Sequence, residues 1–483
     1  MSENRSVVSG IGTMAALTIS SKLVRLFILM VTARFLTPED FGVVAAFTMV
    51  FGFAYLVADM GILRTVIQRP LISERHIGSA LGLSVGLCTL VSITLIFLGT
   101  SIADILTIEE IGLPLKVSSL MFLLLGVSNI CSALLQRGGK ILFIGKVQAF
   151  GTITGNVFVT VPLLYSDIGY WAIIVGLWVS ELISILFILQ KGWGNLRYKI
   201  YKKELVEISK YASAFFFNNT LGLLSQQLDI AIVSRFLGSA TLGNYSRAMQ
   251  LVEFPNQIYF LVVDRVVFPV MAAMKSEKDK LVFFFLQSLS LLSLALTLGS
   301  IILIVGAHQI VLIMMGSQWG VVGDLLQILA SCIVFRGLAS FMDSFLAAYD
   351  LVKILTGKQV FSLCILLILV WLGLDYGVVG VAYAIVVASI FRFLLTLILI
   401  VIKTRIMGFQ LISAFTPSIY SSIIIITIYL LTSLIYPVLA GLSGGLIAVM
   451  IFLIFNIIKP LEIFVTIQGV DFIKRKKSIF VFF

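Results

Sequence analysis

Nine ionisable side chains lie deep inside apolar stretches of this 483-residue chain. The basic ones are Lys22, Arg25, Arg247, Arg336 and Arg392, and the acidic ones are Glu181, Asp229, Glu253 and Asp343. Ionisable groups are costly in such surroundings, so they usually line a polar cavity or pair with one another. Two interpretations follow. The cations could hold an anionic substrate while the acids bind a coupling ion, or the charges could neutralise one another in salt bridges between helices.

The pair Lys22 and Arg25 favours substrate binding. They lie 12 and 9 residues before Arg34, which at about 1.5 Å per residue places both near the middle of one apolar helix. They are three residues apart on one helical face, and their own stretch contains no acid. We therefore expect an anionic headgroup to bind in a central cavity at Lys22, Arg25, Arg247 and Arg336. The candidates for binding a coupling Na⁺ or H⁺ are Asp229, Glu253 and Asp343.

Neutral polar residues mark the same region of the sequence. One apolar stretch is unusually rich in amides, namely Asn218, Asn219, Gln226 and Gln227. Amide side chains suit sugar hydroxyls, although they also join neighbouring helices. Pro255 follows Glu253 by two residues and predicts a kink in its helix, where bending could accompany transport.

The composition is that of a polytopic membrane protein. Hydrophobic residues make up 60% of the chain and charged residues 12%, with a mean hydropathy of +1.12, whereas soluble domains carry about 25% charged residues. A membrane-spanning helix needs about 20 mostly apolar residues. That length predicts an all-α protein with fourteen spans and short connections, at residues 10–34, 41–62, 77–100, 112–135, 141–166, 170–190, 211–236, 242–270, 281–306, 321–349, 354–374, 377–402, 411–436 and 438–458.

Charge distribution orients these spans. With a cytoplasmic N-terminus, the cytoplasmic segments hold most of the 34 basic residues, Lys353 and Lys358 among them. The opposite loops collect acids such as Glu39 and Asp40. We therefore expect both termini on the cytoplasmic side of the membrane. The net charge of +11 then reflects membrane topology and a basic tail on anionic lipid, and not nucleic-acid binding.

Arg64 and Arg265 are expected at the cytoplasmic rim of spans 2 and 8, beside Asp59 and Asp264. Anchoring by basic residues with a local ion pair is the simpler interpretation. The alternative is a basic cytoplasmic mouth that gathers phosphate headgroups.

No metal site or cofactor is expected. The two histidines, His76 and His308, are far apart in the sequence. All four cysteines lie in apolar stretches without a Cys-x-x-Cys spacing, which is typical of small core residues.

An internal repeat organises the chain. The stretch RFLTPEDFG at residues 34–42 returns as RFLGSATLG at residues 235–243, an offset of 201. In the first copy, Thr37 suits a helix N-cap, Pro38 the first helical position, and Asp40 a capping box. Six spans in each half predict two parallel lobes with a cavity between them. The expected units are an N-terminal lobe (1–200), a C-terminal lobe (201–405), two further spans (406–458) and a basic cytoplasmic tail (459–483).

Three stretches resemble one transporter family. Residues 34–70, with Asp59 and Gly61, are similar to the first hairpin of polysaccharide-unit flippases in the multidrug/oligosaccharidyl-lipid/polysaccharide (MOP) exporter superfamily, and closest to its lipopolysaccharide biosynthesis group. Residues 243–274 and 376–384 resemble that family's eighth span and the start of its twelfth. The resemblance implies a location in the bacterial inner membrane, where an undecaprenyl-diphosphate-linked oligosaccharide moves from the cytoplasmic to the outer leaflet by ion-coupled alternating access. It further implies a polysaccharide polymerase and the chain-length and export machinery as partners.

Two other functions are weighed against flipping. A multidrug/cation antiporter of the same superfamily usually takes cationic substrates, which a basic pair in mid-membrane disfavours. A membrane enzyme such as a polysaccharide polymerase needs a catalytic segment, typically with clustered acids or a large outer loop. The sequence has no Asp-x-Asp motif and only short loops, so we expect a transporter rather than an enzyme.

Overall fold

The computed structural model describes residues 2–263, 267–404 and 406–435. Every regular element in these ranges is helical, which confirms the all-α prediction for this part of the chain. The predicted fourteenth span and basic tail lie outside the described residues. The α-helices are α1 (Ser2–Phe35), α2 (Pro38–Asp59), α3 (Ile62–Gln68), α4 (Glu74–Leu106), α5 (Gly112–Arg137), α6 (Ile141–Ile153), α7 (Val161–Leu164), α8 (Trp171–Gly192), α9 (Lys202–Leu237), α10 (Ser239–Val262), α11 (Phe268–Ala273), α12 (Lys278–Val305), α13 (Ala307–Met314), α14 (Gly320–Leu329), α15 (Cys332–Ala348), α16 (Val352–Gly373), α17 (Gly377–Lys403) and α18 (Gly408–Ile435).

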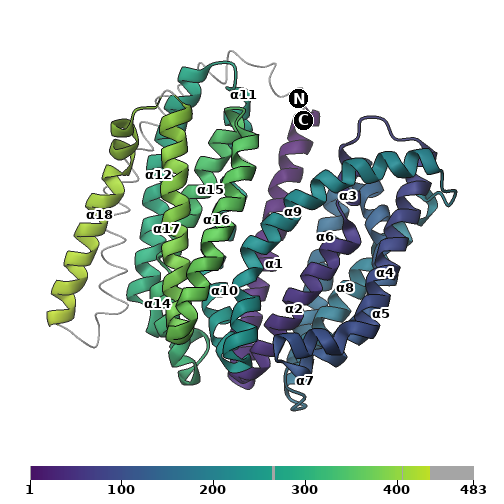
Figure 1. Ribbon diagram of the computed structural model, residues 1–483, viewed down its shortest axis with the longest axis horizontal. Coiled ribbons are helices and arrows are strands. Elements are labelled where there is room, and N and C mark those ends of the chain that lie inside the picture. The colour runs from purple at the N-terminus through teal and green to yellow at the C-terminus, as the bar shows by residue number, and fades with distance from the viewer. Residues whose placement is uncertain (1, 264–266, 405, 436–483) are drawn as a thin grey trace.

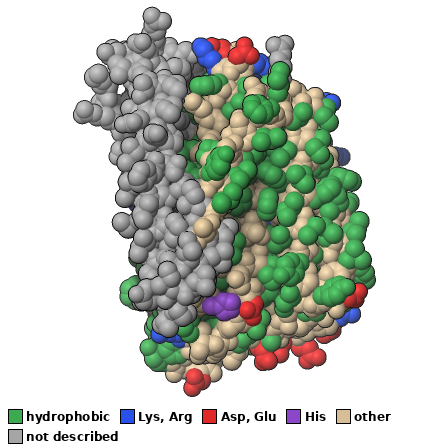
Figure 2. Space-filling model, turned by 90° about the vertical axis from the view of Figure 1, so that its left-hand side faces the viewer, with side chains coloured by type: hydrophobic (Ala, Val, Ile, Leu, Met, Phe, Trp, Pro, Cys, Tyr) green, Lys and Arg blue, Asp and Glu red, His purple; other side chains and the backbone are tan. Residues whose placement is uncertain are grey.

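The chain is a multi-pass membrane protein. Within the described residues, seven helical segments are long and apolar enough to cross a bilayer, or eight if the bent pair α14 and α15 counts as one. The segment Val352–Lys403 contains both α16 and α17, which pack against each other. Figure 2 shows hydrophobic side chains over the middle of one face and charged side chains toward its two ends. Such a belt fits a lipid environment.

Helix α2 begins as its sequence dictates. Thr37 is the N-cap, its side chain accepts a hydrogen bond from the Asp40 backbone, and the Asp40 carboxylate accepts one from the Thr37 backbone at 3.0 Å. Pro38 occupies the first turn. The predicted capping box is therefore confirmed. The helix ends at Met60 and Gly61, which both have positive φ, so the predicted span 41–62 breaks there and α3 follows.

Two predicted spans differ from the observed helices. The span predicted at 321–349 is two helices, α14 and α15, bent by 45° at Ala330–Ser331. Helix α9 begins at Lys202, so residues expected in a cytoplasmic connection continue the span predicted at 211–236. Charged residues such as Lys203 and Glu204 have high helix propensity, which allows a helix to extend beyond its apolar part.

The helices form two groups, here called the N-lobe (α1–α8) and the C-lobe (α9–α17). Figure 1 shows them converging at the lower end of the view, where α2 packs against α10. Helix α9 crosses between the groups: its first half contacts α3 and α4, and it also packs against α10, α16 and α17. The predicted boundary at residue 200 thus falls just before the helix that joins the lobes.

The convergent end, here called the hairpin end, brings the two copies of the repeat together. A Cβ atom added to Gly42 would lie 1.9 Å from the Ser239 carbonyl oxygen. A Cβ added to Gly243 would lie 1.8 Å from the Pro38 carbonyl oxygen. Gly42 and Pro38 correspond to Gly243 and Ser239 at the offset of 201, so the contact is reciprocal. Only glycine permits two backbones to approach this closely.

Further contacts close the hairpin end. The Trp319 indole donates to the Ala33 carbonyl oxygen at 2.8 Å, and the Trp319 ring packs edge-on against Phe41 at 5.3 Å between centroids. Gln318 donates to the same Ala33 oxygen at 2.6 Å. These bonds fasten the connection after α13 to the end of α1, so C-lobe residues seal against the N-lobe.

The opposite end carries ion pairs between connections predicted on the cytoplasmic side. Arg69 pairs with Glu207 at 2.5 Å, and His76 lies 3.3 Å from the other oxygen of that carboxylate. Arg197 pairs with Glu74 at 2.6 Å. Hydrogen bonds from Arg69 and His76 lower the pKa of Glu207. The first half of α9 is thereby fastened to the N-lobe.

Candidate functional site

A cavity of about 370 Å³ lies within the C-lobe. Five helices surround it: α9, α10, α15, α16 and α17. Eight of its lining residues are neutral amides or serines, three are charged, and none is aromatic. The lining residues are Gly222, Ser225, Gln226, Glu253, Asn256, Gln257, Arg336, Ser340, Gln359, Ser362, Leu363, Leu366, Ala388, Ser389 and Arg392. A polar cavity inside an apolar bundle is a binding-site candidate on chemical grounds alone.

Pro255 lies on α10 between Glu253 and Asn256, which both line the cavity. It sits inside α10 and has no N–H to donate to the carbonyl one turn earlier. The kink predicted at this proline therefore coincides with the cavity wall. Asn256 is 5% exposed, and its Oδ1 atom has no hydrogen-bond partner within the described residues.

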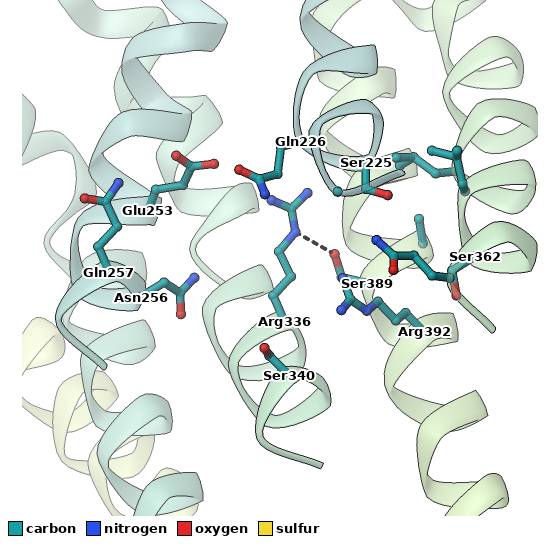
Figure 3. A pocket seen from close by; sticks show the side chains of 15 residues that line it. Ser225, Gln226, Glu253, Asn256, Gln257, Arg336, Ser340, Ser362, Ser389 and Arg392 are labelled. Atoms are coloured by element: carbon teal, nitrogen blue, oxygen red, sulfur yellow. Dashed lines mark hydrogen bonds between the residues drawn. The ribbon is translucent and has the colours of Figure 1, made fainter. Parts of the chain in front are cut away.

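Arg336 projects into the middle of the cavity. Its Nε donates to the Ser389 hydroxyl at 3.2 Å. Figure 3 shows its guanidinium extending toward Gln226, with Glu253 on one side and Ser389 on the other. Over the described ranges, Arg336 forms no ion pair within 4.0 Å, although it interacts electrostatically with Glu253. The predicted cation is thus inside a cavity, hydrogen-bonded to a neutral hydroxyl and near the acids Asp229 and Glu253.

Asp343 joins three helices behind the cavity wall. Its carboxylate accepts a hydrogen bond from Lys358 on α16 and another from Arg392 on α17, the latter at 3.2 Å. Lys358 also donates to the Thr396 hydroxyl at 2.9 Å. The Lys358 side chain is only 2% exposed. Its assignment to the cytoplasmic segments was therefore wrong, because this lysine lies within α16, inside the span predicted at 354–374, and its charge is balanced inside the protein.

The other two predicted ion-coupling acids have different surroundings. Asp229 is 5% exposed and accepts hydrogen bonds from the Tyr245 hydroxyl and from the Ile230 backbone, the latter at 2.9 Å. It does not line the cavity. Glu253 does line it, and in the described part of the chain no cation lies within ion-pair distance of its carboxylate. The three acids therefore differ. Asp229 is buried and hydrogen-bonded to a tyrosine, Glu253 faces the cavity, and Asp343 is paired with two cations.

Lys22 and Arg25 approach from the N-lobe. The Lys22 ammonium donates a hydrogen bond to Gln257, which lines the cavity. Arg25 is exposed and interacts electrostatically with Glu181 of α8. The structure therefore places Lys22 at the edge of the cavity and Arg25 beside an acid of its own lobe.

The remaining predicted cations are not in the cavity wall. Arg247 lies over the Phe41 ring at 4.6 Å, where it helps to join the lobes at the hairpin end. Arg64 is exposed. The neighbouring Asp59 accepts from the backbone of Gly61 at 3.2 Å instead of pairing with that arginine. Arg265 lies outside the described residues.

Sequence reasoning missed most of the neutral lining. Gln226 was singled out with the amides of its span, but Asn256, Gln257 and Gln359 were not. The signal was present, because amides inside apolar stretches are costly unless they have partners. Asn256, Gln257 and Gln359 lie in apolar stretches just as Gln226 does, so the same pattern of amides marks them.

The comparisons with known proteins agree with this architecture. Residues 31–323 match the family model of polysaccharide biosynthesis proteins. The chain is 24% identical to the lipopolysaccharide biosynthesis protein WzxC of Escherichia coli (strain K12), over 82% of this chain and 81% of that one. It is 21% identical to the succinoglycan biosynthesis transport protein ExoT of Rhizobium meliloti (strain 1021), over 62% and 60%.

A solved structure shares the fold. The lipid II flippase MurJ in an inward closed conformation superposes with a TM-score of 0.75, covering 91% of this chain and 98% of that one at 16% identity. At this identity the likeness concerns the fold alone. The family match covers more than half of the sequence, and it includes the first repeat, the hairpin end and the α10 wall of the cavity. The chain therefore belongs to the polysaccharide biosynthesis protein family.

Proposed function

We propose that this protein is a transporter that flips an undecaprenyl-diphosphate-linked oligosaccharide from the cytoplasmic to the outer leaflet of the bacterial inner membrane. The observation that carries the proposal is a polar cavity with cations, enclosed by a lipid-exposed helical bundle of this family. A lipid-linked glycan has a polar part that needs such a cavity to cross the bilayer. Its polyprenyl chain can stay among the lipids.

The proposed transport direction rests on the charges of the two ends. The hairpin end contains acids such as Glu39 and Asp40, and the opposite end contains Arg69, Arg137 and Arg197. Basic connections favour the cytoplasmic side. The hairpin end would then face outward, and its closed contacts would have to separate for release.

The diphosphate is the part of the substrate that requires cations. Lys22 and Arg25 are the proposed binding residues because they lie on the side from which α1 meets the cavity. Lys22 contacts a neutral amide, which leaves its charge available to a phosphate. Arg336 lies farther inside, next to Glu253.

Ion coupling by Na⁺ or H⁺ belongs to the same proposal. Among Asp229, Glu253 and Asp343, the best-placed acid is Glu253 because it faces the cavity without a bound cation in the described part of the chain. A polymerase and the chain-length and export machinery would receive the flipped product. These partners are proposed from the reaction sequence, since each flipped unit must be consumed on the outer side.

The test is deletion of the gene in its native host, followed by extraction of lipid-linked intermediates. Undecaprenyl-diphosphate-linked oligosaccharide should accumulate on the cytoplasmic side and disappear on complementation. The double variant Lys22→Ala/Arg25→Ala should fail to complement at normal protein level. Lys146→Ala is the matched control, because Lys146 is an exposed cation of α6 that does not line the cavity.

An unchanged pool of lipid-linked oligosaccharide in the deletion strain would contradict flipping, and altered drug efflux in that strain would support an antiporter. Full transport by the double variant would instead contradict only the assignment of the two cations.

A further inference from the structure

The cavity wall is chemically suited to hydroxyl groups. Eight of its side chains are neutral amides or serine hydroxyls, and they come from all five surrounding helices. Amide side chains provide both hydrogen-bond donors and acceptors, and a hydroxyl group can donate or accept a hydrogen bond. Only two large apolar side chains, Leu363 and Leu366, contribute to the wall. The wall therefore offers a polyhydroxylated group hydrogen bonds that a polyprenyl chain could not use.

Two polar atoms in this wall lack partners. Asn256 is 5% exposed, and its Oδ1 has no hydrogen bond within the described residues. The Ser362 Oγ is likewise buried without a partner there. A buried polar atom without a hydrogen bond is costly, so such atoms indicate a ligand or water that supplies one. The two atoms lie on α10 and α16, on different walls of the same cavity.

Each of the two cations in the cavity wall has an acid nearby. Arg392 bonds to Asp343, which also binds Lys358. Arg336 bonds to Ser389 and faces the acid Glu253 across the cavity. A diphosphate would bring further negative charge next to Glu253 and compete with Asp343 for Arg392. The cavity thus favours a ligand with little net charge.

One cation of the N-lobe, Lys22 on α1, lies at the cavity edge. Its ammonium donates to Gln257 at the α10 wall and interacts electrostatically with Glu253, but it forms no ion pair within 4.0 Å among the described residues. A ligand with an anionic part and a hydroxyl-rich part would fit with its phosphates at α1 and its hydroxyls in the C-lobe.

We infer that the C-lobe cavity is the saccharide subsite of the transporter, in which the sugars nearest the diphosphate bind through their hydroxyls to Gln226, Asn256, Gln257, Gln359 and Ser362. This inference rests on the proposed function. It assigns the sugar and the diphosphate to opposite lobes, and it makes these neutral side chains the residues that determine which sugar is accepted.

The test measures two ligands separately on the full-length protein in nanodiscs. The probes are the free repeat-unit oligosaccharide, released by mild acid from the host polymer, and undecaprenyl diphosphate without sugar. Ser362→Ala and Gln359→Leu should each weaken oligosaccharide binding about three- to tenfold, the equivalent of one lost hydrogen bond. Both variants should keep the affinity for undecaprenyl diphosphate within about twofold of the wild-type value. Lys22→Ala should weaken undecaprenyl diphosphate binding and leave oligosaccharide binding unchanged.

Gln309→Leu is the matched control. Its amide oxygen is also buried without a partner, but Gln309 lies on α13 and does not line the cavity. It should leave both affinities unchanged. Ser362→Ala removes a hydroxyl that has no bond within the described residues, so the variant is expected to fold normally.

Unchanged oligosaccharide affinity in both cavity variants would overturn the subsite, and so would an equal loss for the two probes. Failure of the wild-type protein to bind undecaprenyl diphosphate would instead count against the proposed function. The two failures are therefore distinguishable.

Discussion

The reciprocal glycine contact at the hairpin end predicts how the lobes can be forced apart. A methyl group at Gly42 would lie 1.9 Å from the Ser239 carbonyl oxygen, and one at Gly243 would lie 1.8 Å from the Pro38 oxygen. Nonbonded heavy atoms normally approach to about 3.5 Å. Gly42→Ala therefore requires α2 and α10 to separate by about 1.5 Å where they meet.

The energetic cost falls on one conformation only. Overpacking a close contact typically costs about 1–3 kcal/mol. A conformation in which the hairpin end is open does not contain the contact and escapes this cost. The population of the open conformation should then rise by about 5- to 150-fold relative to the closed one. The double variant Gly42→Ala/Gly243→Ala should open the hairpin end little more than the more effective of the two single variants. One added methyl group already separates α2 from α10 at both glycine contacts.

The assay is a spin-label distance measurement across the hairpin end. Leu113 and Tyr376 are suitable label sites because they are 60% and 80% exposed and lie on different lobes. The exposed Cys364 is first replaced by Ser, while the other three cysteines are buried. Gly42→Ala should enrich the long-distance population. Gly52→Ala on the same helix is the control, since a Cβ there meets nothing within 4 Å.

Identical distance distributions in Gly42→Ala, Gly52→Ala and the parent protein would refute this reasoning. The glycine contact would then be one that the helices relieve locally, by a shift of a single turn, without moving the lobes.

Two further predictions concern ion pairs. Asp343→Asn should lower the free energy of unfolding by about 3–5 kcal/mol, because it leaves the buried Lys358 charge without its carboxylate. Thermal unfolding in detergent measures this loss. The double variant Asp343→Asn/Lys358→Met should recover much of the lost stability, and no recovery would show that the loss has another origin. Glu207 stabilises the protein at neutral pH because Arg69 and His76 lower its pKa, and this contribution should be lost as the pH falls below about 4.3 through that lowered pKa. The stability difference between wild type and Glu207→Gln should accordingly be larger at neutral pH than in acid, and a difference independent of pH would argue against the contact.

Local structure was predictable where short-range chemistry decides it. Thr37, Pro38 and Asp40 form the capping box that their spacing indicates, because every partner lies within three residues. The repeat was visible for the same reason: its signal is a string of residues at one fixed offset. The sequence did not indicate that the two copies touch, with Gly42 of the first copy against Ser239 of the second and Gly243 of the second against Pro38 of the first.

The pairing of charges was not predictable. Asp343 binds Lys358 and Arg392, which lie 15 and 49 residues away on other helices. Such partners depend on how each helix is rotated about its axis. A helix that is apolar all round gives no periodicity from which to infer that rotation. The same limit explains why Lys358 was assigned to the cytoplasmic segments and why most of the amide lining was missed.

The contact between the lobes follows the symmetry of the repeat, whereas the cavity does not. The hairpin end is symmetric, because Gly42 meets Ser239 as Gly243 meets Pro38, and a reciprocal contact can open by rotation of one lobe against the other. The cavity is asymmetric: all fifteen of its lining residues come from C-lobe helices, while the N-lobe contributes Lys22 at its edge. A substrate with a charged end and a hydroxyl-rich end would therefore bridge the lobes when bound. Opening of the hairpin end moves the lobes apart and would then weaken the binding of this substrate to one of them. The movement that exposes the outer side would thereby also promote substrate release.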